Sequence, residues 1–124
     1  MEIKSYRDLI VWQKAMALMV DCYKMTDKLP KTEIYTLSSE IRRSALHIPS
    51  FIADGQGRKN TGEYIQRLGT AYGSLMMLET QLQAVEMLQF LPISEIEPLL
   101  EKSSEVGKML NKLIQSLRSG RPES

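Results

Sequence analysis

The residues of this sequence with the most recognisable chemistry are five basic side chains near the middle of the chain. They are Arg42, Arg43, Arg58, Lys59 and Arg67. Guanidinium and ammonium groups bind phosphate through charge-assisted hydrogen bonds, so this set is a candidate interface for RNA or DNA. The interpretation that we favour is structural, with an arginine such as Arg43 or Arg67 paired to an acidic residue inside one subunit or between subunits. Glu40 and Glu79 are the candidate partners.

Three further side chains have the types found in hydrolases. His47, Ser50 and Asp54 stand at positions i, i+3 and i+7, which places them on one face of a helix. Nucleophilic catalysis also needs an oxyanion site and a strained nucleophile turn, and no motif in the chain supplies either. We therefore expect no catalytic residues and no enzymatic activity.

Metal and cofactor sites are also not expected. The chain has one histidine and one cysteine, Cys22, whereas metal sites in helical bundles combine several carboxylates with at least two histidines. The segment "GQGRKNT" has glycines that could wrap a phosphate, but Gly57 is followed by Arg58, where a P-loop needs a lysine after its last glycine. This segment instead predicts a helix end, with Gly55 and Gly57 in left-handed conformations and Asn60 or Thr61 capping the next helix.

The overall composition indicates an ordinary globular domain. The chain has 124 residues, is 43% hydrophobic and 25% charged, and has a formal charge of +1, so only a local patch could attract a polyanion. The N-terminal "MEIKSYRDL" has charges where a signal peptide is apolar, and no apolar run approaches the roughly 20 residues of a membrane span. We expect a cytoplasmic protein without a membrane partner.

The first half of the sequence predicts two helices. The first ends before Pro30, is capped by Ser5 or Asp8, and has an apolar stripe at three- and four-residue steps. That stripe is Leu9, Trp12, Met16, Met19 and Tyr23. The second begins near Thr32, and its apolar period continues through Pro49, which predicts a kinked helix. Its stripe is Ile34, Leu37, Ile41, Ala45, Ile48 and Ile52.

The second half predicts two longer helices. The third, about residues 62–89, has the stripe Tyr64, Leu68, Ala71, Leu75, Leu78, Leu82 and Val85. A second uncharged set widens the apolar surface of this helix beyond what one bundle buries, so we predict a subunit contact there. The set is Gly69, Tyr72, Gly73, Met76 and Met77. Ser94 and Glu97 predict a capping box for the fourth helix, whose stripe runs from Ile96 to Leu117.

Four helices with short connections and no strand pattern predict an all-α, up-down-up-down antiparallel four-helix bundle. We expect residues 1–118 to form one domain and residues 119–124 to form a flexible tail.

The segments "RRSALHIPSFIADGQGRKN" and "YIQRLGTAYGSLMMLETQL" give the sequence a resemblance to the 23S rRNA intervening-sequence proteins. These are small bacterial proteins encoded in insertions within large-subunit rRNA genes or elsewhere in genomes. The resemblance covers nearly the whole chain, including the opening "YRDLIVWQKAMALMVDCYKMTDKLP". We expect the shared motif residues to be structural. They are Pro49, Gly55, Gly57, Gly73, Ser74, Glu79 and Thr80.

The resemblance implies a helical bundle that assembles as a ring, commonly a homopentamer, with no established enzymatic activity. Related bundles are nucleic-acid-binding partners of reverse transcriptases. Our leading hypothesis is therefore a homo-oligomeric bundle that binds RNA or DNA weakly through arginines repeated around the ring. The alternative is a scaffold that docks a protein partner such as a reverse transcriptase. In that case the motif would only join the second and third helices, with Gly69 and Gly73 allowing close approach and Arg43 meeting Glu79.

Overall fold

The computed structural model describes residues 2–121, and its regular structure in this range is entirely helical. The four main helices are α1 (Ile10–Thr26), α2 (Leu37–Gln56), α3 (Thr61–Met87) and α4 (Ile93–Arg118). Two short 3-10 helices, η1 (Tyr6–Asp8) and η2 (Lys31–Glu33), precede α1 and α2. The predicted all-α, four-helix fold is confirmed.

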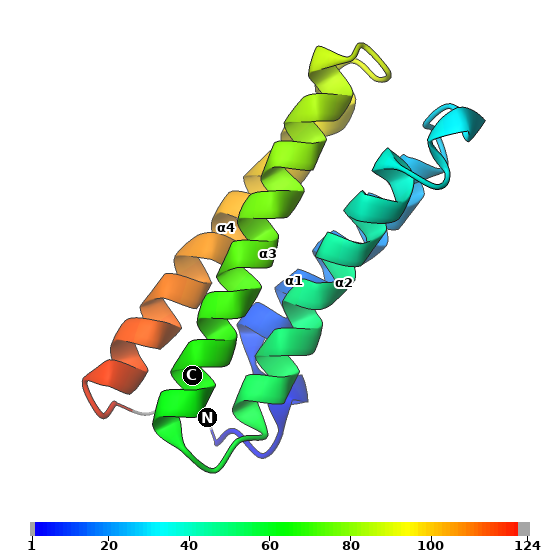
Figure 1. Cartoon of the computed structure of the whole chain (residues 1–124). Coiled ribbons are helices and arrows are strands. Elements are labelled where there is room, and N and C mark those ends of the chain that lie inside the picture. Colours follow the sequence, from blue (N-terminus) through cyan, green and yellow to red (C-terminus); the bar gives the residue numbers. More distant parts are fainter. Residues whose placement is uncertain (1, 122–124) are drawn as a thin grey trace.

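The helices are arranged so that each contacts its neighbours in the chain and α4 closes the bundle against α1. Figure 1 shows that successive helices run in opposite directions, so that the start of α1 and the end of α4 lie at the same end of the molecule. Contact is most extensive between α2 and α3 and least extensive between α1 and α4. Within the described residues, none of the helices is both long and apolar enough to span a membrane.

The core of α1 differs from the predicted stripe. The fully or nearly fully buried residues of this helix are Val11, Ala15, Leu18, Cys22, Met25 and Thr26. Leu9, just before the helix, is buried as predicted, but the other four residues of the predicted stripe are only half-buried. The two stripes have the same three- and four-residue spacing, so periodicity alone could not choose between them.

The start of α1 also differs from the prediction. Ser5 caps η1, where its hydroxyl accepts a hydrogen bond from the Arg7 backbone N–H, and Asp8 completes the capping box. The N-cap of α1 itself is Leu9, which provides no side-chain bond.

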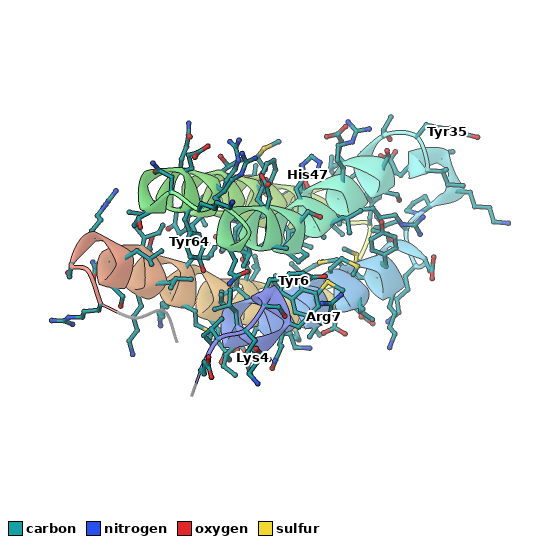
Figure 2. All side chains as sticks on the ribbon, turned by 90° about the horizontal axis from the view of Figure 1, so that it is seen from below. Lys4, Tyr6, Arg7, Tyr35, His47 and Tyr64 are labelled. Carbon is teal, nitrogen blue, oxygen red and sulfur yellow. The ribbon has the colours of Figure 1, made fainter. Side chains whose placement is uncertain are left out.

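Helix α2 begins later than predicted, because a 3-10 turn occupies residues 31–33 and Thr36 is the N-cap. Ile34 therefore lies outside the helix and is 51% exposed, while Tyr35 is 93% exposed and projects from the end of the molecule (Figure 2). From Leu37 onward the predicted stripe is correct, and α2 continues without a break through the buried Pro49. The bend at Pro49 stays a prediction.

The predicted left-handed glycines at the end of α2 are wrong. Gly55 lies inside the helix, and Gly57 is the C-cap with φ −75°, an ordinary right-handed conformation. Gly55 instead leaves room for side chains of α3, because a Cβ there would lie 3.0 Å from both Arg67 Cβ and Tyr64 Cδ1. The missing side chain lets the end of α2 approach the start of α3.

The N-cap predicted for α3 is correct, and the capping box predicted for α4 is wrong. The Asn60 side chain caps α3 by accepting a hydrogen bond from the Glu63 N–H at 3.1 Å. The predicted Ser94 capping box is absent, since α4 begins at Ile93 with Pro92 as its N-cap and no side-chain bond.

The predicted buried positions of α3 are all buried, and most of those of α4 are buried too. After α4 the described chain ends in a turn at Gly120, whose φ is +72°. Residues 122–124 of the predicted tail lie outside the described residues.

Candidate functional site

The five basic residues of the candidate nucleic-acid interface do not form one patch. Arg42 and Arg43 lie in the first half of α2, whereas Arg58, Lys59 and Arg67 lie at the junction of α2 and α3. The helical stretch from Arg42 to the last residue of α2, Gln56, alone spans about 21 Å at 1.5 Å per residue, and Arg58 follows beyond it. The structure therefore divides the predicted site into two places.

Arg42 is held by the end of α1. Its Nε donates a 2.8 Å hydrogen bond to Thr26 Oγ1, and its Nη2 donates a 3.0 Å hydrogen bond to Asp27 Oδ1. The guanidinium also lies 5.1 Å from the centre of the Tyr23 ring, within the range of a cation–π contact. These contacts fix the C-terminal end of α1 against α2, so the role of Arg42 in this chain is structural.

The second place is a charge cluster at the α2–α3 junction, which we call the junction cluster: Asp54, Arg58, Glu63 and Arg67. Asp54 lies between two arginines, with Arg58 Nη2 3.0 Å from its Oδ1 and Arg67 Nε 2.9 Å from its Oδ2. The Arg67 Nε atom is buried, and the contact is one of charge because its N–H is not aligned for a hydrogen bond. Arg58 also lies 3.6 Å from Glu63 Oε1. Two positive charges thus meet two negative charges, and the cluster has no net charge.

The other two residues of the candidate set, Arg43 and Lys59, are exposed. Arg43 lies 3.4 Å from Glu40 Oε1, one turn away on the same helix, and both side chains are largely in solvent. Within the described residues Lys59 makes no hydrogen bond or ion pair. Pairs of this exposed kind are worth about 0–1 kcal/mol, so a phosphate could displace Glu40 from Arg43 at little cost. Arg43 and Lys59 are the members of the predicted set that remain available.

The hydrolase-like trio does not assemble. The Ser50 hydroxyl donates to the carbonyl of Leu46 at 2.8 Å, and Asp54 is engaged in the junction cluster. His47 faces outward from α2 (Figure 2) and makes an edge-on contact with the Phe51 ring. No hydrogen bond links the three side chains within the described part of the chain.

The predicted subunit-contact set divides between two surfaces. Gly69 and Gly73 lie on the exposed face of α3, where an added Cβ would meet nothing within 4 Å, and Met77 is 54% exposed. Met76 and Tyr72 are half-buried against the core, and Tyr72 leans toward Gly107 on α4. The exposed members of the set, Gly69, Gly73 and Met77, form an uncharged stripe with the neighbouring exposed Thr80, and we call these four residues the α3 stripe.

Gly69 and Gly73 therefore do not bring α2 and α3 together. The scaffold alternative had predicted that these two glycines allow close approach of the second and third helices. Within one chain the close approaches occur at Gly55, and at Gly107, where an added Cβ would lie 3.2 Å from Leu75 Cδ2. Gly69 and Gly73 are open to another molecule.

Glu79 has a different partner from the predicted Arg43. Its Oε2 accepts a 2.6 Å hydrogen bond from the hydroxyl of Ser103, which is fully buried on α4. Among the other motif residues, Ser74 is buried, and the exposed Thr80 donates its hydroxyl to the Met76 carbonyl at 2.9 Å. Sequence reasoning missed the link to Ser103, because a serine in an apolar stripe does not identify its acceptor.

Sequence reasoning also missed three ion pairs between the α1 and α4 segments. They are Lys14–Glu105, Asp21–Lys102 and Lys28–Glu95. The signal was present, because Lys14, Asp21 and Lys28 are spaced by seven residues and so fall on one side of a helix.

Comparison with known proteins gives a match to a protein-family model and matches to solved structures. A protein-family model described as 23S rRNA-intervening sequence protein matches residues 7–112. A crystal structure of a protein of unknown function from the S23 ribosomal protein family of Bacteroides thetaiotaomicron is similar, with a TM-score of 0.79 and 20% sequence identity. The alignment covers 85% of this chain and 98% of that chain, and at this identity it shows the fold alone. The comparison with curated proteins gives no match.

Proposed function

The chain belongs to the 23S rRNA-intervening sequence protein family, and from this premise we propose that it is a non-enzymatic, homo-oligomeric scaffold. The bundle would associate through the α3 stripe into a ring, with five subunits favoured by the family resemblance. Its task would be to display the same outer surfaces several times on one rigid body.

The observation that carries this proposal is the open, uncharged face of α3. Glycine is unfavourable in the middle of an exposed helix by about 0.5–1 kcal/mol relative to alanine. Gly69 and Gly73 are separated by one turn, both are exposed, and neither is needed to pack the chain's own bundle. Small residues at this spacing permit close approach of a second helix, so contact with another subunit would explain their presence.

The test is light scattering on the purified protein and on Gly69→Glu. This substitution adds a charge and bulk to the α3 stripe, and open space at Gly69 means that it should not disturb the isolated bundle. We expect the wild type to be an oligomer and Gly69→Glu to be smaller with unchanged helical circular dichroism. Gln115→Glu, at an exposed position on α4, is the matched control and should keep the wild-type mass. A monomeric wild type would reject the scaffold, and an intact Gly69→Glu oligomer would reject this face as the contact.

A second candidate function is weak binding of RNA or DNA, and the available side chains of Arg43 and Lys59 favour it. Two such separate charges on a nearly neutral chain bind weakly, but a ring repeats both around one body and gains avidity when several copies engage the same polyanion. Arg42 and Arg67 would contribute little, because their guanidinium groups are committed to contacts within the chain.

Salt titration of binding separates the two functions. If nucleic acid is bound, the logarithm of the affinity should fall linearly with the logarithm of salt concentration, and Arg43→Gln with Lys59→Gln should reduce that slope. Absence of RNA and DNA binding by an intact oligomer would leave the scaffold, docking a protein such as a reverse transcriptase, as the function. Conversely, retention of binding in the double variant would show that other residues contact the phosphates.

A further inference from the structure

The interface between α1 and α4 is held together at its surface by charge. Lys14 Nζ lies 3.3 Å from Glu105 Oε1, and Lys28 Nζ lies 3.0 Å from Glu95 Oε2. Between them Lys102 pairs with Asp21. The three pairs follow one side of the α1 segment at seven-residue intervals, and we call them the α1–α4 ladder.

Two surface hollows lie along the same side of the bundle as the ladder. A hollow of about 220 Å³ lies between the start of α1 at Leu9–Val11 and the part of α4 that includes Met109 and Leu113. A second hollow, of about 210 Å³, lies farther along, where Asp21 and Lys28 face Lys102. Side chains next to a hollow lose contacts on that side, and contact between α1 and α4 is the least extensive among the neighbouring pairs of main helices.

The opposite interface, between α2 and α3, is closely packed. Gly55 allows the end of α2 to lie directly against Tyr64 and Arg67, and a short connection at residues 57–60 joins the two helices. The chain also links α1 to α2 and α3 to α4, but no connection links α1 directly to α4 (Figure 1). The bundle therefore has one tight side and one side where separation breaks no chain connection.

We propose that the bundle opens reversibly along the α1–α4 interface, with the α2–α3 interface acting as the hinge, and that ionic strength sets the open fraction. The ladder side chains are between about one third and one half exposed, so dissolved ions reach them. The Debye length falls from about 10 Å at 0.1 M salt to about 3 Å at 1 M, which weakens exposed pairs while leaving apolar contacts in place. Salt thus weakens the α1–α4 interface, which has three such pairs and no chain connection.

Cys22 provides a built-in reporter of the open state. It is the chain's one cysteine, is fully buried on α1, and lies next to the ladder residue Asp21. Burial raises the pKa of its thiol to about 12, so the closed bundle holds it protonated and inaccessible. Only the thiolate reacts rapidly with alkylating reagents, so modification requires opening.

The experiment measures alkylation of Cys22 by iodoacetamide, a neutral reagent, at pH 8 in 0.05 M and 1 M NaCl. We expect the rate, corrected with a free-thiol peptide, to rise at least threefold in high salt. Lys102→Met should react at least threefold faster than the wild type in low salt and respond less to salt. Exchanging the charges, Asp21→Lys with Lys102→Asp, should restore slow reaction. Arg43→Met, which removes an exposed pair outside the interface, is the control and should match the wild type.

Urea separates local opening from global unfolding. Opening along one interface exposes less surface than global unfolding does, so below the unfolding transition the alkylation rate should depend less steeply on urea than global unfolding does. A steep urea dependence matching that of global unfolding would overturn the proposal, as would a rate independent of salt in the wild type. If Lys102→Met loses its helical circular dichroism, Lys14→Met tests the same ladder at another pair.

Discussion

The hydroxyl of Ser103 donates a 2.6 Å hydrogen bond to Glu79 Oε2, which joins α4 to α3 at a point where the serine is fully buried. A carboxylate that accepts such a bond at the edge of an apolar interface is partly withdrawn from water. The bond thus replaces hydration that Glu79 has lost on folding.

Ser103→Ala should lower the free energy of unfolding by about 1–2 kcal/mol, because a hydrogen bond to a charged group is lost and the carboxylate is left poorly solvated. Glu79→Gln keeps an acceptor oxygen and should cost less. Urea unfolding followed by circular dichroism measures both. Equal stability of Ser103→Ala and the wild type would show that water fully replaces the serine.

Gly55→Ala should destabilise the protein by about 1–3 kcal/mol, because the added methyl group would force α2 away from α3. The contacts to be relieved are at 3.0 Å, to Arg67 Cβ and Tyr64 Cδ1. Gly57→Ala is the matched control, since its Cβ would meet only ordinary contacts at 3.5 and 3.6 Å and its φ of −75° suits alanine. Its stability should be equal to or slightly above that of the wild type, and a similar loss in both variants would contradict the packing role of Gly55.

Arg42→Ala and Arg43→Ala, adjacent in sequence, should differ in stability. The first substitution removes hydrogen bonds to Thr26 and Asp27 and should cost about 1–2 kcal/mol. The second removes only the exposed contact with Glu40 and should change stability by less than about 0.5 kcal/mol. Thermal unfolding gives the comparison, and a reversed order would remove the structural assignment of Arg42.

The Cys22 thiol should make the stability of the bundle fall at alkaline pH. Burial is the main cause that raises its pKa from 9.0 to about 12, with the neighbouring charge of Asp21 adding to the shift and Lys102 opposing it. Above pH 9 the unfolded chain releases the thiol proton while the folded chain retains it. The contribution of the thiol to the free energy of unfolding is therefore complete below pH 9. It is lost as pH rises from 9 toward 12, at about 1.4 kcal/mol per pH unit.

Urea midpoints of the wild type and Cys22→Ala at pH 8, 9 and 10 isolate this effect, since other groups titrate in both proteins. The difference in stability between the two should shift in favour of the variant above pH 9. A difference that stays constant with pH would mean that the thiolate is accommodated in the folded state.

Helices α3 and α4 illustrate what could be predicted from the sequence. Each has one apolar stripe that continues along most of the helix, and Leu75 and Leu110 in these stripes are buried as expected. In α1 two stripes of equal period compete, and the prediction chose Trp12 and Met16 where the core contains Ala15. The neighbouring helices decide such a choice, because a small residue fits the centre of a narrow bundle while larger side chains occupy its flanks.

The candidate site shows the same difference between what the sequence predicts and what the tertiary structure decides. Residue types alone identified Arg42, Arg58 and Arg67 as groups able to bind anions, but their partners on other elements decided which of them remain available. The sequence by itself determined the number of helices, the apolar faces of α2, α3 and α4, and the family, because these follow from local periodicity and motif spacing. Only the tertiary structure decided that Gly55 is a packing contact, that Glu79 binds Ser103 and that α1 meets α4 through charge. Those outcomes depend on which residues distant in sequence share a surface, and no local pattern contains that information.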